Sequence, residues 1–181
     1  MDGRTRLRGY PKTLLLAALV LAAVSLAEAR RPAAAEAPWG APLRAVEQAL
    51  ERHDVGAATR AWQDAHLAAL GSWRWEGMIE AGDAALRIGE VSGLRPAAKA
   101  RARQAYLTAF FRARDQESLA GVLRSAEAFA LLGDREVVAQ CLIAADGLAA
   151  RAADPEGRER LRSFAALWAS TAWAAETPAA P

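Results

Sequence analysis

Hydrophobic residues recur at the spacing of helix faces along most of this 181-residue chain. From residue 42 to residue 173, apolar side chains return every three or four positions, which is the period of one face of an α-helix. The strict alternation of β-branched and aromatic residues that half-buried strands show does not occur. Gly, Ser, Asp and Pro interrupt the pattern and divide it into seven predicted helices. These span residues 42–52, 55–70, 73–91, 96–113, 116–132, 135–151 and 155–173.

Residues that favour helix starts precede or open several of these segments. Pro42 and Pro155 stand at first-turn positions, where a helix tolerates proline because the missing N–H has no intrahelical partner. Asp115 and Asp154 are expected to cap the fifth and seventh helices with side-chain oxygens, and Ser72 is placed to cap the third. These signals define the predicted helix starts more firmly than periodicity alone.

The third predicted helix, residues 73–91, leaves one alternative open. Its apolar stripe keeps a single phase, which favours one helix, whereas Gly82-Asp83 would split it into two short ones. Trp73 and Trp75 lie two positions apart at its start, so they cannot both face the same way. One indole is therefore expected to be partly exposed. It is a candidate anchor for a partner protein, the alternative being that it packs against a neighbouring helix end.

The connections predict how the helices stack. Links of about two to five residues force neighbouring helices to lie antiparallel. Asp115, Asp134 and Asp154 recur 19 and 20 residues apart, so two helices make a unit of about 39 residues. A regular hairpin repeat of this kind is typical of solenoids, and a closed bundle is the competing architecture. The predicted fold is all-α: antiparallel helical hairpins stacked as a short α–α superhelix.

Small and aromatic residues around the turns resemble those of tetratricopeptide-like repeats. After the turn at residues 53–54, Ala58, Trp62 and Ala65 match the family's order of small, aromatic and small residues. The unit here departs from the family, being nearer 39 than about 34 residues long. The resemblance implies a scaffold that binds proteins or peptides. A similar but weaker match is made by Phe129, Gly133, Val138, Leu142 and Ala145.

The first 29 residues have the order of a secretory signal peptide. Residues 1–12 carry four basic side chains, residues 14–26 are uncharged and mostly Leu, Ala and Val, and residues 27–29 read Ala-Glu-Ala. The apolar run is shorter than the about 20 residues that a membrane span needs. We therefore expect export to the periplasm or the exterior, the alternative being an uncleaved anchor formed by residues 13–29.

The remaining segments complete the predicted domain organisation. Residues 30–41 are rich in Ala and Pro and are expected to form a flexible linker. Residues 42–173 are assigned to the helical-repeat domain, and residues 174–181 to a disordered tail. Trp39 and Trp173 flank the domain and are expected to be only partly ordered.

Charge excludes one class of partner. Apolar residues make up 53% of the chain, mostly as alanine, and the formal net charge is +2. Outside residues 1–29, however, 19 basic residues face 19 acidic ones, so the body is neutral. A nucleic-acid-binding protein usually carries net positive charge there to neutralise phosphates. We expect no nucleic-acid partner, and a membrane partner only if the leader is uncleaved.

The sequence has few residues that are suited to catalysis or to binding a metal. His53 and His66 are the only histidines, and Cys141 lies on an apolar helix face where a thiol acts as a small hydrophobic group. Glycine-rich phosphate loops, nucleophile motifs and Cys/His clusters do not occur. We therefore expect no catalytic residue, no metal and no cofactor.

Two charged stripes are candidate contact surfaces. The basic one, Arg95, Lys99 and Arg103, could meet an acidic peptide, a phosphate or an anionic lipid. The acidic one lies on the preceding helix, so the two stripes could also simply pair with each other or face solvent. Its members are Glu76, Glu80 and Asp83.

Three functions remain compatible with the sequence. The first is a non-enzymatic scaffold of the bacterial cell envelope that binds a protein or peptide, with Trp73, Trp75 and the basic stripe as candidate contacts. The second is a helical carrier of a small apolar ligand, which would need a closed cavity lined by Trp62, Phe110 and Phe129. The third is a structural accessory subunit of a larger complex.

Overall fold

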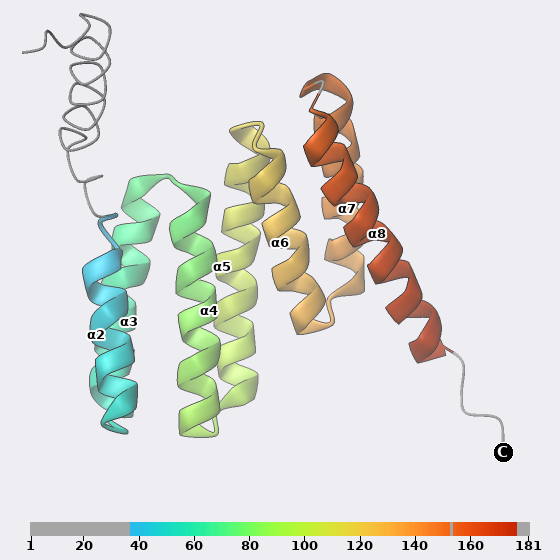
Figure 1. Cartoon of the computed structure of the whole chain (residues 1–181). Helices are drawn as coiled ribbons and strands as arrows, with labels where there is room; N and C mark the ends of the chain where they lie inside the picture. The colour runs from blue at the N-terminus through green and yellow to red at the C-terminus, as the bar shows by residue number, and fades with distance from the viewer. Residues whose placement is uncertain (1–36, 153, 177–181) are drawn as a thin grey trace, which may run out of the picture. The chain divides into compact units, whose positions relative to one another are not determined.

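The computed structural model describes residues 37–152 and 154–176. This part of the chain is all-helical, with seven α-helices and no strand (Figure 1). The leader and residues 30–36 of the predicted linker lie outside it, as do residues 177–181 of the predicted tail. The helices are α2 (Gly40–Glu51), α3 (Val55–Ser72), α4 (Trp75–Ser92), α5 (Arg95–Asp115), α6 (Leu119–Leu132), α7 (Arg135–Ala152) and α8 (Pro155–Glu176).

The helices stack as antiparallel hairpins in chain order (Figure 1). Each helix packs against the next, and the most extensive packing joins α4 to α5. A second set of contacts links alternate helices: α2 with α4, α4 with α6, and α6 with α8. The even-numbered helices therefore form one layer, and α3, α5 and α7 form the other. This is a solenoid-like arrangement, as the hairpin repeat predicts.

Side-chain caps start the helices that follow a tight turn. Asp54 accepts a hydrogen bond from the Ala57 N–H at 2.8 Å, and Asp154 accepts one from the Gly157 N–H at 2.9 Å. The predicted cap at Asp115 is wrong, because α5 continues through Asp115. The true cap of α6 is Ser118, whose hydroxyl accepts from the Gly121 N–H at 3.1 Å.

Ser72 also has a different role from the predicted one. It is the last residue of α3, where its hydroxyl donates to the Ala69 carbonyl at 2.7 Å and accepts from the Arg74 N–H at 3.2 Å. The α4 N-cap is Arg74, which makes no side-chain capping bond. Ser72 therefore closes one helix instead of opening the next.

Residues 75–92 form a single helix, which confirms that interpretation of the third segment. Gly82 does not interrupt α4, because it faces α5 at a point where any side chain would collide with the Tyr106 ring. Two turns further along that face, Gly89 stands against Ala98 in the same way. Both glycines allow α4 and α5 to approach closely, which explains why glycine is tolerated inside a helix despite its cost.

Trp39 belongs to the core, which corrects its placement in a flexible linker. It is only 2% exposed, and a Cβ on Gly77 would lie 2.7 Å from its ring. Its indole N–H donates to the Glu80 carboxylate at 3.0 Å. The helical body thus begins before Pro42, with α2 starting at Gly40. At the other end, α8 continues to Glu176, into the stretch predicted as tail.

Candidate binding face

Two hollows lie on the layer of even-numbered helices, and their lining residues define what we call the even-helix face. The first, the α2/α4 hollow, has a volume of about 350 Å³ and is lined by Gly40, Leu43, Arg44, Glu47, Glu80, Asp83 and Arg87. The second, the α6/α8 hollow, has a volume of about 570 Å³ and is lined by Arg124, Glu127, Ala130, Leu131, Phe164, Leu167 and Trp168.

One ion pair forms the boundary between these hollows. Arg124 of α6 donates to Asp83 of α4 at 2.9 Å, so each hollow contributes one partner. The Tyr106 hydroxyl of α5 donates to the other Asp83 oxygen at 2.6 Å. Burial, with the Asp83 carboxylate beside the hydroxyl, raises the pKa of Tyr106, so it stays a donor. The half-buried network of three side chains fixes α4 and α6 relative to each other.

The α2/α4 hollow is polar. Arg87 and Glu47 face each other across it with a 2.6 Å ion pair. Glu80 accepts a hydrogen bond from the neutral indole of Trp39. The walls of this hollow therefore present charged groups that are already partly satisfied, along with an exposed carboxylate at Glu80.

The α6/α8 hollow is apolar and open. Leu131 and Leu167 are 76% and 65% exposed, and Phe164 and Trp168 are only half-buried. The cause is the placement of α8, which packs less extensively on α7 and α6 than α5 does on α4. Large apolar side chains converge here on a concave surface, which is the usual make-up of a binding site and not of a solvated helix face.

The two tryptophans at the start of the third segment separate as predicted. Trp75 is half-buried, and its ring fills the space that a side chain on Gly121 of α6 would need. Trp73 is 74% exposed and lies in the turn between α3 and α4, where its backbone adopts a left-handed conformation with φ of 58°. Trp73 is therefore the exposed one of the pair.

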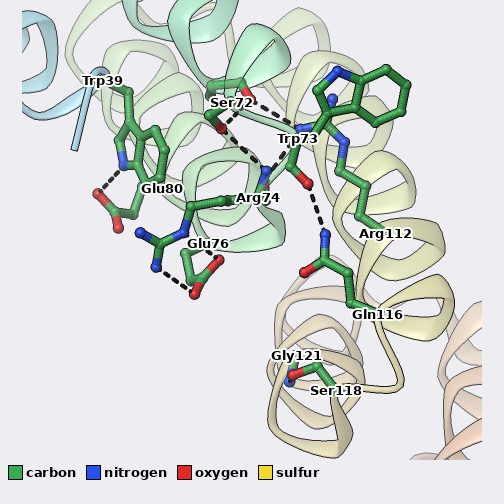
Figure 2. Close-up of polar contacts among 11 residues, drawn as sticks. Trp39, Ser72, Trp73, Arg74, Glu76, Glu80, Arg112, Gln116, Ser118 and Gly121 are labelled. Carbon is green, nitrogen blue, oxygen red and sulfur yellow. Dashed lines mark hydrogen bonds and ion pairs between the residues drawn. The ribbon is translucent and has the colours of Figure 1, made fainter.

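Hydrogen bonds from α5 hold the Trp73 turn in place (Figure 2). The Arg112 guanidinium donates to the carbonyls of Ala69 and Leu70 at 2.9 and 2.8 Å, and its Cζ lies 5.4 Å from the centre of the Trp73 ring. Gln116 donates to the Trp73 carbonyl at 2.8 Å. Desolvation lowers the pKa of Arg112. The exposed indole is thus mounted on a backbone that is hydrogen-bonded from a second helix.

The two charged stripes do not pair with each other as one alternative expected. Arg103 donates to Asp134 at the start of α7, at 2.7 Å, while Arg95 and Lys99 line a hollow of about 290 Å³ between α4, α5 and α6. Of the acidic residues, Glu76 pairs with Arg74 at 2.8 Å. Glu80 and Asp83 lie on the even-helix face, with the partners described above. Of the candidate residues, Trp73 therefore lies in a turn and Arg95, Lys99 and Arg103 lie on α5, so none of them lines the even-helix face.

His66 and Cys141, which were weighed as catalytic or metal-binding residues, lie in packed surroundings. His66 stacks on Trp62 with ring centres 5.1 Å apart, and burial, followed by the Arg112 charge, lowers its pKa. Cys141 is buried, and burial, followed by the Asp134 carboxylate, raises its pKa to about 12. Within residues 37–152 and 154–176, His, Cys, Asp and Glu side chains form no cluster of three suited to a metal. In that same part of the chain, no helix is both long and apolar enough to cross a membrane.

The three aromatic residues expected around an apolar ligand do not converge. Phe110 and Phe129 are buried in the main core, where Phe129 meets the edge of the Tyr106 ring. Trp62 packs on a separate apolar cluster between α2, α3 and α4, and its indole donates to the Ala81 carbonyl at 2.7 Å. The cavity that the carrier hypothesis requires is not formed by these residues.

Sequence reasoning missed the residues of the α6/α8 hollow. A signal was present, because Leu131 and Leu167 fall off the apolar stripes of their helices, where an alanine-rich sequence has no packing need for leucine. Their convergence depends on how α8 crosses α6, which periodicity does not reveal. Comparison with models of protein families, with curated proteins and with solved structures finds no match for the chain.

Proposed function

We propose that this chain is a non-enzymatic scaffold that binds a segment of another protein on its even-helix face. One observation supports the proposal most strongly: Leu131, Leu167, Phe164 and Trp168 converge on an open apolar hollow of about 570 Å³. Exposed apolar side chains gathered in one concave place are typical of interaction sites, whereas the same residues scattered singly are not. Aromatic side chains such as Trp168, once a partner covers them, often dominate the affinity of such sites.

The chain's architecture favours the same function. Hairpins stacked in chain order give a layer of parallel helices, and extended layers of this kind serve as binding surfaces in solenoid proteins. The resemblance of Ala58, Trp62 and Ala65 to tetratricopeptide-like repeats implies the same role. The basic and apolar leader at residues 1–29 supports an exported protein of the bacterial cell envelope, with the partner in the same compartment.

Two leucines of equal exposure provide a matched test of the proposed surface. Leu167 on the even-helix face and Leu67 on α3 are both 65% exposed. A photo-reactive amino acid is placed at one or the other position of the full chain, in the native host, and cross-linked products are separated by mass. We expect position 167 to give a discrete product with one partner, and position 67 to give none above background.

The partner obtained from position 167 is then challenged with a variant. Leu131→Asp adds a charge to the hollow at a residue that is 76% exposed, so the fold is expected to remain intact. Loss of the discrete product in this variant would support the α6/α8 hollow as the contact. Equal labelling from positions 67 and 167, or a product that Leu131→Asp leaves unchanged, would contradict the proposed function.

A further inference from the structure

A third hollow adjoins the even-helix face and indicates what kind of segment that face accepts, an inference that rests on the proposed function. We call it the basic hollow; it lies between α4, α5 and α6 and has a volume of about 290 Å³. Leu131 of α6 lines both this hollow and the α6/α8 hollow. Because one shared side chain lies between the two hollows, a segment that fills the α6/α8 hollow can continue across Leu131 into the basic hollow.

The lining of the basic hollow carries an excess of positive charge. Its charged residues are Arg95 and Lys99 of α5 and Glu90 of α4, and all three are exposed. The two hollows of the even-helix face differ in this respect, because their carboxylates equal or outnumber their arginines. Of these three hollows, the basic hollow is therefore the one that favours an anionic group.

Both cations of the basic hollow are unpaired. Within residues 37–152 and 154–176, neither Arg95 nor Lys99 forms an ion pair, a side-chain hydrogen bond or a cation–π contact, and Glu90 pairs with neither of them. Arg103, the third residue of the basic stripe, is different because it donates to Asp134 at 2.7 Å. A carboxylate brought to Arg95 and Lys99 by a partner therefore has no internal ion pair to displace.

The remaining walls of the basic hollow are apolar. Leu86 and Leu132 are half-buried, and Leu131 is 76% exposed. Long basic side chains can lay their methylene groups along such leucines and keep the charged end in water. The hollow thus combines an apolar floor with charged residues, which is the composition of a protein contact with an apolar centre and a polar rim.

Helix geometry sets the spacing of the two cations. Arg95 and Lys99 are four residues apart on α5, so they share one face and lie about 6 Å apart along the helix axis. Two acidic side chains have a similar separation when they are three or four residues apart on a helix, or two residues apart on an extended chain. A partner segment of either conformation can therefore present one carboxylate to each cation.

We propose that the segment bound on the even-helix face is apolar with two flanking acidic side chains. Its apolar side chains fill the α6/α8 hollow, and its two carboxylates pair with Arg95 and Lys99 on the other side of Leu131. The apolar contact supplies most of the affinity. The carboxylates set the direction in which the segment lies and select against basic segments, which the same cations repel.

Two synthetic peptides test this assignment with the full chain. Both contain the same block of Leu and Ala, which is flanked at each end by Glu-Ala-Glu in the Glu peptide and by Gln-Ala-Gln in the Gln peptide. Their ends are acetylated and amidated, so side chains carry the only charges. Binding is measured by fluorescence anisotropy. We expect the Glu peptide to bind about three- to ten-fold more tightly at low salt, with a smaller ratio at high salt because exposed charges are screened.

Variants of the protein locate the effect. The double variant Arg95→Gln/Lys99→Gln is expected to weaken binding of the Glu peptide by about three- to ten-fold and to leave the Gln peptide unchanged. The control is Arg52→Gln/Arg60→Gln, which removes two exposed guanidinium groups, at the end of α2 and on α3, that line none of these three hollows. Circular dichroism checks that each variant retains its helices.

Lys99 also allows the contact itself to be detected. Lysine occurs at only two positions, Lys12 and Lys99, so Lys99 is the one lysine left in a Lys12→Arg background. A carbodiimide activates the carboxylates of the bound Glu peptide, and the lysine amine displaces the urea to form an amide bond. We expect mass spectrometry to find Lys99 joined to a glutamate of the peptide. Lys99→Arg should keep the binding and lose this product.

The outcomes separate this inference from the proposed function. Equal binding of the Glu and Gln peptides, weakened for both by Leu167→Ser, would overturn the acidic assignment and keep the even-helix face as a binding surface. Failure of the Glu peptide to bind, or an equal loss in the control double variant, would also overturn the assignment. So would binding to phosphatidylglycerol vesicles that requires Arg95 and Lys99 and that the Glu peptide does not compete. Photo-cross-linking from position 167 tests the proposed function separately.

Discussion

The α4/α5 hairpin and the α7/α8 hairpin are built from similar alanine-rich helices but pack very differently. In the first, Gly82 and Gly89 let the helices approach until Tyr106 and Ala98 fill the contact, and the packing is the most extensive of the fold. In the second, α8 lies on α7 with far less contact, and of its described side chains Leu161 is the one buried hydrophobic residue.

This difference means that the hairpin with the most extensive packing is not the one that lines the apolar hollow. The closed hairpin buries Met78, Tyr106 and Phe110, and its exposed apolar side chains, Val91, Leu94 and Phe111, do not line either hollow of the even-helix face. The open hairpin leaves Phe164, Leu167 and Trp168 to line a hollow with α6. Apolar area removed from water stabilises the fold at about 25 cal/mol per Å², so area left exposed at α8 remains to be buried by association. The extensively packed part of the molecule thus supports the part that we propose as the binding surface.

The same substitution in the two hairpins should have unequal effects. Phe110→Ala in α5 removes a buried ring and is expected to lower the free energy of unfolding by about 3–5 kcal/mol. Phe164→Ala in α8 removes a half-buried ring and should cost roughly half of that or less. Urea denaturation followed by circular dichroism measures both. Equal losses would mean that α8 is packed as tightly as α5.

Replacing one glycine in each hairpin with alanine should change the stability of the protein in opposite directions. Gly82→Ala is expected to destabilise the protein by about 1–3 kcal/mol, because the new methyl group collides with the Tyr106 ring. Gly147→Ala in α7 should instead stabilise it by about 0.5–1 kcal/mol, since a Cβ there meets only the far end of Arg151 at 3.6 Å. Melting temperatures report the two signs. Destabilisation by Gly147→Ala would show that α7 is closely covered there.

A smaller effect concerns pH in the N-terminal hairpins. Burial, and then the Arg112 charge, hold the pKa of His66 below its unfolded value near 6.5. The unfolded chain therefore takes up the proton first as pH falls, so stability present above about pH 6.5 is lost between that pH and the folded pKa. Denaturation in steps from pH 7.5 to pH 5 should show a shallower loss in His66→Gln than in the wild type. An unchanged slope would place His66 outside the packed structure.

Local sequence signals were sufficient to predict the positions of the helices and most of their ends. The apolar period located all seven helices in the described part of the chain, and Asp54 and Asp154 act at the turns where polar residues indicated breaks. Asp115 was wrong because the choice between two capping residues three positions apart, Asp115 and Ser118, depends on where α5 meets α3. Arg112 donates to the Ala69 carbonyl of α3 and Gln116 to the Trp73 carbonyl just after it, and α5 continues as far as Asp115.

Contacts between residues far apart in sequence were not predictable in this way. Trp39 lies beside an Ala- and Pro-rich stretch, and its burial depends on the gap at Gly77, 38 residues later. The two-residue offset between Trp73 and Trp75 is a local property and predicted that one of them is exposed, but it did not indicate that this is Trp73. The α6/α8 hollow requires the crossing of two helices about 40 residues apart, so single-sequence periodicity could not show it.

Amide hydrogen exchange of the full chain tests the contrast between the two hairpins most directly. We expect the slowest exchange in α4 and α5, and exchange in α8 faster by at least about two orders of magnitude, because α8 opens without disturbing the closed hairpin. Protection of α8 equal to that of α4 and α5 would contradict the account.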